Sequence, residues 1–215
     1  SIYVSGRYAY VANSNVLSNN LSVVDISNPS TPVEISTVAL EANPISVYVS
    51  GRYAYVANYG AKSISVVDIS NPAIPVQAAT TSVGESPRSI IVSGRYAYVA
   101  NYASNTISVV DIINPLAPIQ ITTTSVGTSP SSVFVSGRYA YVSNFTSGNI
   151  SVVDISGTEV SSLIAHSAEV GNLQSRNDIF AQGNIIAGTG LMVGAGGIMS
   201  NGSLSVFAST TGSTS

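Results

Sequence analysis

A ten-residue stretch, VSGRYAYVAN, occurs at residues 4–13, 49–58 and 92–101, and once more as VSGRYAYVSN at residues 135–144. The arginines of the four copies lie 45, 43 and 43 residues apart, and the aspartates of the SVVDI segments that follow lie 43 residues apart throughout. A fixed period in the low forties is typical of chains built from repeated supersecondary units. The chain is therefore expected to fold as an array of equivalent units.

Each repeat contains four strand-like runs, which in the third copy cover residues 89–93, 95–101, 106–112 and 119–126. They are rich in Val, Ile, Tyr and Thr, are bounded by Gly, Pro and Asn, and show no helical period. Four short antiparallel strands per repeat form the blade of a β-propeller. We therefore predict an all-β fold, with a propeller over residues 1–168 whose four-stranded blades cover residues 1–43, 44–86, 87–129 and 130–168.

The first two strands of each repeat are joined through Ser-Gly, which suits a two-residue hairpin because Gly tolerates the positive φ of such turns. Placing Arg95 opposite Asp111 predicts that Tyr98 faces Ser108 and that a three-residue loop follows Asn101. An exposed cross-strand pair of this kind contributes about 0–1 kcal/mol, and we interpret it as structural rather than catalytic. The predicted pairs are Arg7 with Asp25, Arg52 with Asp68, Arg95 with Asp111, and Arg138 with Asp154.

Both faces of these strands are apolar. In the third repeat, Ala97 and Val99 lie on one face, while Tyr96 and Tyr98 lie on the other. A strand that is apolar on both faces has to be covered on both, as a blade is by its two neighbours. The repetition therefore has a physical reason, since no copy can bury its own faces alone.

The run YAYVAN, followed by ISVVDISNP and PV at residues 53–76, resembles the LVIVD repeat, a relative of the YVTN-type propellers of surface proteins. The resemblance covers about residues 1–165 and implies bladed propellers on exported prokaryotic proteins, without a common catalytic site. Such propellers usually have more than four blades, so either four close here or further blades lie upstream of Ser1. The fourth repeat has DISGTEVSS where the others have NPxxP, which marks the end of the array.

From residue 173 the pattern changes to hexads that begin with Leu or Ile and end with Gly, Asn, Asp or Ser. The pattern predicts a hexad-repeat β-solenoid or triple-β stalk over residues 169–208, followed by a flexible end at 209–215. Six hexads are too few to bury a core in one chain, whereas three chains wound together could do so. The segment resembles the Gly-rich shafts of trimeric tail fibres and adhesins, which implies a homotrimer.

The amino-acid composition argues against several classes of function for this chain. Charged residues make up 8% of the chain, the net charge is −3 and Lys62 is the only lysine, so nucleic acid is not an expected partner. No apolar run is long enough to insert into a membrane. The absence of Cys and the abundance of Ser, Thr and Asn favour an extracellular protein on a bacterial or archaeal surface. The chain starts within a strand-like pattern and lacks an initial Met, so we interpret it as a processed product or a fragment.

The sequence predicts no catalytic residues, no metal site and no cofactor. His166 is the only histidine, and a zinc site needs three or four His, Cys or carboxylate ligands, so with one His and no Cys we expect none. The GTGLMVG run that contains Gly188 and Gly190 lacks the third Gly and the helix of a dinucleotide-binding loop. We therefore expect no enzyme, although some related propellers are lactonases or dehydrogenases.

The copies differ mainly in two sets of loops, which blade geometry places on one rim. Aromatic and charged side chains occur in both sets, and such a rim suits stacking on sugar rings or docking on another protein. The candidate binding residues are Tyr59, Lys62, Arg88, Tyr102 and Phe145, with Glu41 and Glu85 on the same rim. The alternative is that the aromatic rings only pack against adjacent blades.

Our hypothesis is a non-catalytic propeller head, displayed on a multimerising stalk, that acts in adhesion or ligand binding. The alternative is a structural building block of an S-layer or an extracellular filament, in which propellers pack on one another.

Overall fold

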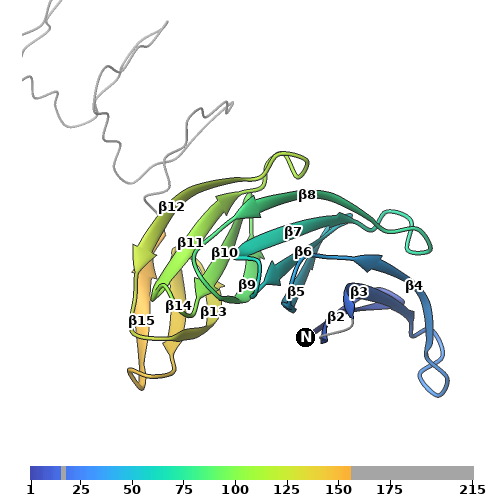
Figure 1. Cartoon of the computed structure of the whole chain (residues 1–215), viewed down its shortest axis with the longest axis horizontal. Helices are drawn as coiled ribbons and strands as arrows, with labels where there is room; N and C mark the ends of the chain where they lie inside the picture. Colours follow the sequence, from blue (N-terminus) through green and yellow to red (C-terminus); the bar gives the residue numbers. More distant parts are fainter. Residues whose placement is uncertain (16–17, 156–215) are drawn as a thin grey trace, which may run out of the picture. The chain divides into compact units, whose positions relative to one another are not determined.

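The computed structural model describes residues 1–15 and 18–155, which all lie in the first of the two units into which the chain divides, Ser1–Ser161 and Ser162–Ser215. These residues form four antiparallel β-sheets (Figure 1). No helix in this part of the chain is long and apolar enough to cross a membrane. His166, the predicted stalk at 169–208 and the predicted flexible end at 209–215 lie outside the described residues.

The sheets are the predicted blades, and each contains consecutive strands in chain order. Blade 1 comprises β1 (Ile2–Ser5), β2 (Tyr8–Asn15), β3 (Ser18–Asp25) and β4 (Val33–Ala39). Blade 2 comprises β5 (Pro44–Ser50), β6 (Tyr53–Asn58), β7 (Ser63–Asp68) and β8 (Val76–Ser82). Blade 3 comprises β9 (Pro87–Ser93), β10 (Tyr96–Asn101), β11 (Thr106–Asp111) and β12 (Ile119–Ser125). The described part of blade 4 comprises β13 (Pro130–Ser136), β14 (Tyr139–Asn144) and β15 (Asn149–Asp154).

The first hairpin of every blade closes through a two-residue Gly-Arg turn. In blade 1, Ser5 faces Tyr8 across the turn, and Gly6 has a φ of 59°. A type II′ turn requires this positive φ at its first central position, which Gly adopts at little cost. The predicted length of two residues is confirmed, but the turn residues are Gly-Arg rather than the predicted Ser-Gly, because Ser5 still pairs with Tyr8 in the ladder.

The predicted register of the second and third strands is wrong by one residue. Tyr96, not Arg95, faces Asp111, and Tyr98 faces Val109 rather than Ser108. The reason is that the arginine occupies the second position of the turn, before the strand begins. The loop that follows Asn101 has four residues rather than three, and its last residue, Asn105, adopts a φ of 57°.

The hydrophobic core consists of layers between successive blades. We call the side of a blade that contacts the next blade in the chain its forward face, and the opposite side its rear face. One layer joins the forward face of blade 2 to the rear face of blade 3, and equivalent layers join blades 1 and 2 and blades 3 and 4. The second and third strands of the two middle blades are accordingly buried on both faces, as the sequence predicts. Burial of each Val or Ile side chain stabilises the fold by about 1.5–3 kcal/mol.

The linker that enters a blade packs on a buried asparagine at the end of the blade's second strand. Asn101 is fully buried, and its Nδ2 donates to Ser108 Oγ at 2.8 Å and to Thr106 Oγ1 at 3.1 Å. Gly84 of the linker approaches so closely that a Cβ atom there would lie 2.6 Å from Asn101 Cγ. Gly127 and Asn144 repeat this contact in blade 4. The close approach therefore favours Gly at residues 84 and 127, whereas the equivalent residue of blade 2 is Glu41.

We expect Gly84→Ala to lower the free energy of unfolding by about 1–3 kcal/mol, because the added methyl group overpacks the buried Asn101. Urea unfolding of the full chain measures this loss. The double variant Gly84→Ala/Asn101→Ala should lose less than the sum of the two single variants, because the smaller side chain removes the clash. Strictly additive losses would contradict the contact.

Candidate functional site

Two sets of loops are hydrogen-bonded together at one end of the blades. Tyr102 N–H donates to Ser86 O at 2.9 Å, and Ala103 N–H donates to Glu85 O at 3.2 Å. Tyr59 and Phe145 make the matching backbone contacts to the preceding linkers in blades 2 and 4. We call these segments the loop rim; it comprises the loops at 59–62, 102–105 and 145–148 and the linkers at 40–43, 83–86 and 126–129. The backbone bonds fix where each loop presents its side chains.

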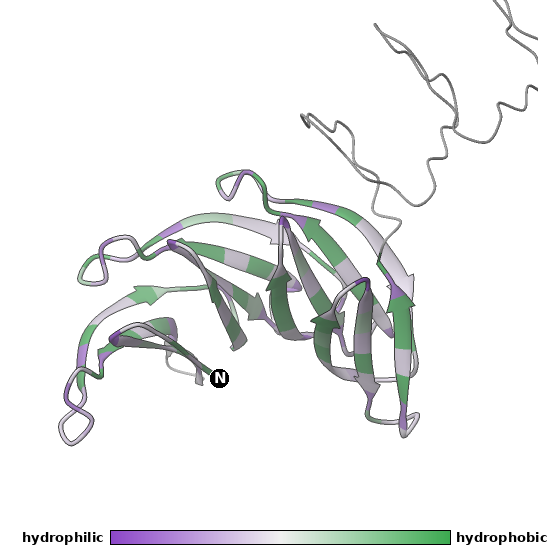
Figure 2. Ribbon diagram, turned by 180° about the vertical axis from the view of Figure 1, so that it is seen from behind, coloured by the Kyte–Doolittle hydropathy of each residue, from purple (hydrophilic) through white to green (hydrophobic). Residues whose placement is uncertain are grey.

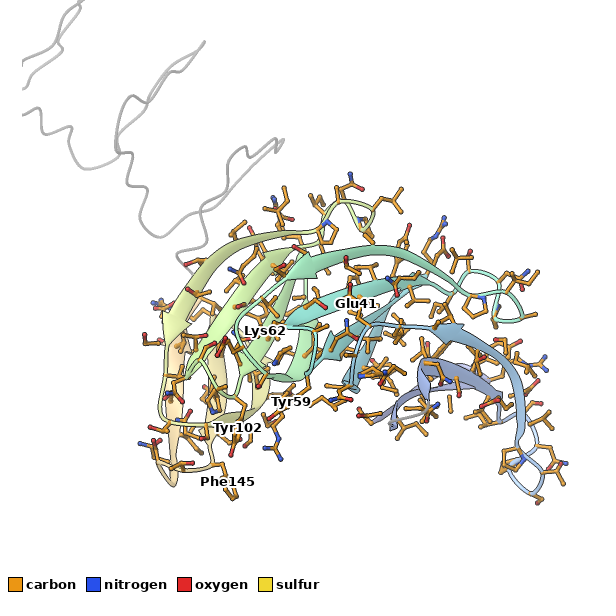
Figure 3. The ribbon with its side chains drawn as sticks, viewed as in Figure 1. Glu41, Tyr59, Lys62, Tyr102 and Phe145 are labelled. Atoms are coloured by element: carbon orange, nitrogen blue, oxygen red, sulfur yellow. The ribbon has the colours of Figure 1, made fainter. Side chains whose placement is uncertain are left out.

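The first residue of each rim loop is aromatic. Tyr59, Tyr102 and Phe145 occupy equivalent positions in blades 2, 3 and 4, and Figure 3 shows them along the inner edge of the array. Tyr59 and Tyr102 are half-buried, whereas Phe145 is 73% exposed. The guanidinium of Arg88 lies 4.8 Å from the centroid of the Tyr102 ring, so these two candidate residues form one cation–π pair. Tyr102 thus has a contact within its own blade, while the Phe145 ring is largely open to solvent.

The charged candidates on the loop rim are paired with one another or with a hydroxyl group. Lys62 forms an ion pair with Glu85, whose pKa is lowered by the hydrogen bond from Lys62. Glu41 accepts a hydrogen bond from Ser63 Oγ. Lys62 has a φ of 55°, a conformation that costs a residue with a side chain about 1–2 kcal/mol. The equivalent residues are Asn105 and Gly148, which adopt it more readily.

The four predicted Arg–Asp pairs form ion pairs at the opposite ends of the same strands. Each aspartate ends the third strand of its blade and contacts the arginine of the Gly-Arg turn. Each guanidinium also lies 5.2–5.3 Å from the ring centroid of the tyrosine that follows it. In blade 1, Asp25 Oδ1 accepts the backbone N–H of Ser27 at 2.9 Å. This aspartate therefore connects the turn to the corner that follows the third strand, and the same arrangement recurs in blades 2 and 3.

Sequence reasoning missed this second role of the aspartates. An Asp that accepts the N–H two residues later forms an Asx turn, and the DIS and DII segments carry that signal. It also missed the asparagines on which the linkers pack. The sequence signal was the asparagine that ends every YVAN or YVSN segment.

We expect the free energy of unfolding to fall as the pH is lowered from about 4 towards 2. The hydrogen bonds from Arg7 and Arg52 lower the pKa of Asp25 and Asp68 to about 2, so these groups bind protons more readily in the unfolded chain, where their pKa is about 3.9. Their contribution is complete well above pH 4 and is lost as the pH falls through the folded-state pKa. Urea unfolding near neutral pH and near pH 2 measures the loss.

The double variant Asp25→Asn/Asp68→Asn is the matched control for this pH dependence. It should lose less stability between the two pH values than the unmodified chain does, because the two titrating groups are gone. An equal loss in both proteins would show that other groups control the acid sensitivity.

A polar hollow of about 730 Å³ lies on blade 1, and its lining includes Asn13, Asn20 and Ser22. Asn13 is the equivalent of Asn101, and in blade 3 the space over that asparagine is filled by the linker containing Gly84. The hollow therefore corresponds to a contact that the other blades make with a preceding blade. Within the described residues, no group of three or more His, Cys, Asp or Glu side chains could hold a metal ion.

Successive four-stranded sheets packed face to face, with loops gathered at one end, define the chain as a β-propeller repeat protein. The model of the LVIVD repeat matches residues 1–39, 43–81, 85–124 and 127–165. The chain belongs to the LVIVD repeat family. No curated protein matches the sequence.

Solved structures share the fold at low sequence identity. A protein of unknown function from Desulfotomaculum acetoxidans is 17% identical with a TM-score of 0.60, over 71% of this chain and 54% of that one. The periplasmic gluconolactonase of Pseudomonas aeruginosa is 21% identical with a TM-score of 0.55, over 72% and 56%. The computationally designed Ika4 protein is 11% identical with a TM-score of 0.55, over 72% and 89%. The chain thus spans about half the length of the two natural proteins.

Proposed function

We propose that the chain is a non-catalytic binding module that acts in adhesion through the loop rim. The observation that supports this function is the recurrence of an aromatic ring at one position in three successive blades, with Phe145 largely exposed. Rings repeated at blade spacing can each stack on an apolar face of a sugar or pack on a partner protein. The backbone hydrogen bonds of the rim loops hold the main chain that carries these rings in place before a ligand arrives.

The ligand class that suits this rim is a carbohydrate or a protein on another surface. Lys62 and Glu85 are both more than half exposed, and Arg88 presents its guanidinium beside Tyr102, so polar contacts flank the rings. Low charge, abundant Ser, Thr and Asn and the absence of Cys support an extracellular location on a cell surface or appendage. The similarity to the gluconolactonase raises a propeller enzyme as the alternative function. At 21% identity, that similarity supports a shared fold and not a shared activity.

We expect the triple variant Tyr59→Ala/Tyr102→Ala/Phe145→Ala to bind an array of immobilised oligosaccharides at least tenfold more weakly, because each lost ring contact contributes about 0.5–1.5 kcal/mol. Leu116→Ala and Ile74→Ala are matched controls, since both side chains are exposed on corners away from the loop rim. Unchanged binding by the triple variant would contradict the proposed site. Opening of gluconolactone by the purified chain would contradict the non-catalytic assignment.

We also propose that residues 169–208 join three chains into a homotrimer, as their hexad pattern suggests. The mass from light scattering gives the number of chains in each particle. This number should be three times larger for residues 1–215 than for a shorter protein that ends near residue 168. An adhesin benefits from such a stalk, because several weak heads on one stalk bind more tightly than one. The same number of chains in both proteins would exclude a trimerising stalk.

A structural building block is the second candidate function. The observation that favours it is the uncovered apolar surface at both ends of the blade array, which includes Ile2 and Ile150.

A further inference from the structure

The two ends of the blade array expose side chains whose equivalents in the other blades are buried or partly buried. On the forward face of blade 4, Ile150 is 68% and Val152 is 57% exposed, whereas their equivalents Ile107 and Val109 in blade 3 are buried. On the rear face of blade 1, Ile2 is 62% and Val4 is 56% exposed. The equivalents of Ile2 and Val4 in the other blades are covered by the preceding blade. Figure 2 shows that hydrophobic residues continue along the strands of the end blades.

These two open faces match the two halves of the internal layers residue by residue. The rear face of blade 3 consists of Ile90, Val92, Ala97, Val99, Val110 and Ile112. The same positions in blade 1 hold the same six residue types, namely Ile2, Val4, Ala9, Val11, Val24 and Ile26. The forward face of blade 3 includes Tyr96, Tyr98, Ile107 and Val109, and blade 4 repeats these residue types with Tyr139, Tyr141, Ile150 and Val152.

A repeated hydrogen bond also links the innermost strands. Ile90 N–H donates to Ser46 Oγ at 3.2 Å, and Val133 N–H donates to Ser89 Oγ at 3.3 Å. The bond between blades 1 and 2 is the same, from Val47 N–H to Ser1 Oγ at 3.4 Å. The next acceptor in this series is Ser132 of blade 4, and the first donor is Ile2 of blade 1. The two ends therefore carry complementary polar groups as well as complementary apolar faces.

We propose that the forward face of blade 4 packs on the rear face of blade 1 of a second copy of this chain, and that the reciprocal contact closes a ring of two copies. The new contacts continue the interface that already joins the four blades. Two copies supply about the length of the natural solved propellers, of which this chain spans 54% and 56%. None of the residues named above on either open face is charged, so no ionised side chain among them has to be desolvated.

This arrangement is independent of what the loop rim binds. A head-to-tail ring places every loop rim on the same side, because each blade is related to the next as blades 2 and 3 are. A ring of two copies would therefore present twice as many aromatic positions in one plane, which favours binding to a surface with repeated ligands.

The test uses the full chain and two single-face variants, Ile150→Asp on blade 4 and Val4→Asp on blade 1. Light scattering over a range of concentrations should show that each variant has half the mass of the unmodified protein. Association should weaken about 100-fold or more, because a charge enters an apolar interface. Ile113→Asp is the matched control, since Ile113 is 70% exposed at a corner outside both faces, and it should leave the mass unchanged. Thermal unfolding checks that all variants are folded.

Mixing the two variants separates head-to-tail pairing from other arrangements. In an equimolar mixture, the intact blade 1 of one variant can pair with the intact blade 4 of the other, so association should be partly restored. The proposal would be overturned if neither substitution lowered the mass. It would also be overturned if the unmodified protein were monomeric at every concentration. Loss of association in only one of the two variants would also overturn it, because that result indicates like faces packing together. The factor of two is distinct from the factor of three expected for the stalk.

Discussion

Apolar burial between the faces of successive sheets is the interaction on which this structure depends. A blade of the repeat has two apolar faces and no layer of its own to cover them, so it gains its stability only from neighbours. A middle blade such as blade 3 contributes to two layers, and Val99 and Ile107 on its opposite faces are both fully buried. Because stacking fixes the separation between blades, it also fixes the separation between equivalent loop residues. The spacing of the aromatic rings on the loop rim is therefore a consequence of the core.

The two ends of the strands perform different tasks. At one end, the Gly-Arg turn, the aspartate and the following corner are held together by an ion pair, a cation–π contact and an Asx turn. This end has almost no freedom to vary, which accounts for the unchanged SGR and SVVD segments. At the loop rim, backbone hydrogen bonds do the anchoring, and they do not depend on side-chain identity. Loops of different sequence can therefore occupy the same place, and recognition can change without loss of the fold.

Most of the fold within the described residues could be predicted from the sequence, because period, turn residues and strand composition all indicate the same blade. The register was wrong because the aspartate carboxylate contacts the arginine in both registers, so the ion pair alone cannot place the strand. Only the turn geometry decides it, and Gly6-Arg7 forms a complete two-residue turn. The pairing of Arg88 with Tyr102 could not be foreseen either, since it joins the start of β9 to the loop after β10. Near-identical copies also give no sequence signal for which faces are left open.

The end blades show why the open faces matter. Repeat arrays that end in solvent usually carry terminal units with a polar outer face. Blade 4 has one such change on its forward face, Ser143 in place of the alanine of the other copies, and this hydroxyl lies 3.0 Å from Ser131 Oγ within the same blade. The large residues around it remain Tyr141, Ile150 and Val152, as in a middle blade. Outer faces that keep the residues of an interior layer are suited to packing against a further blade, and the rear face of blade 1 has the residues that match the forward face of blade 4.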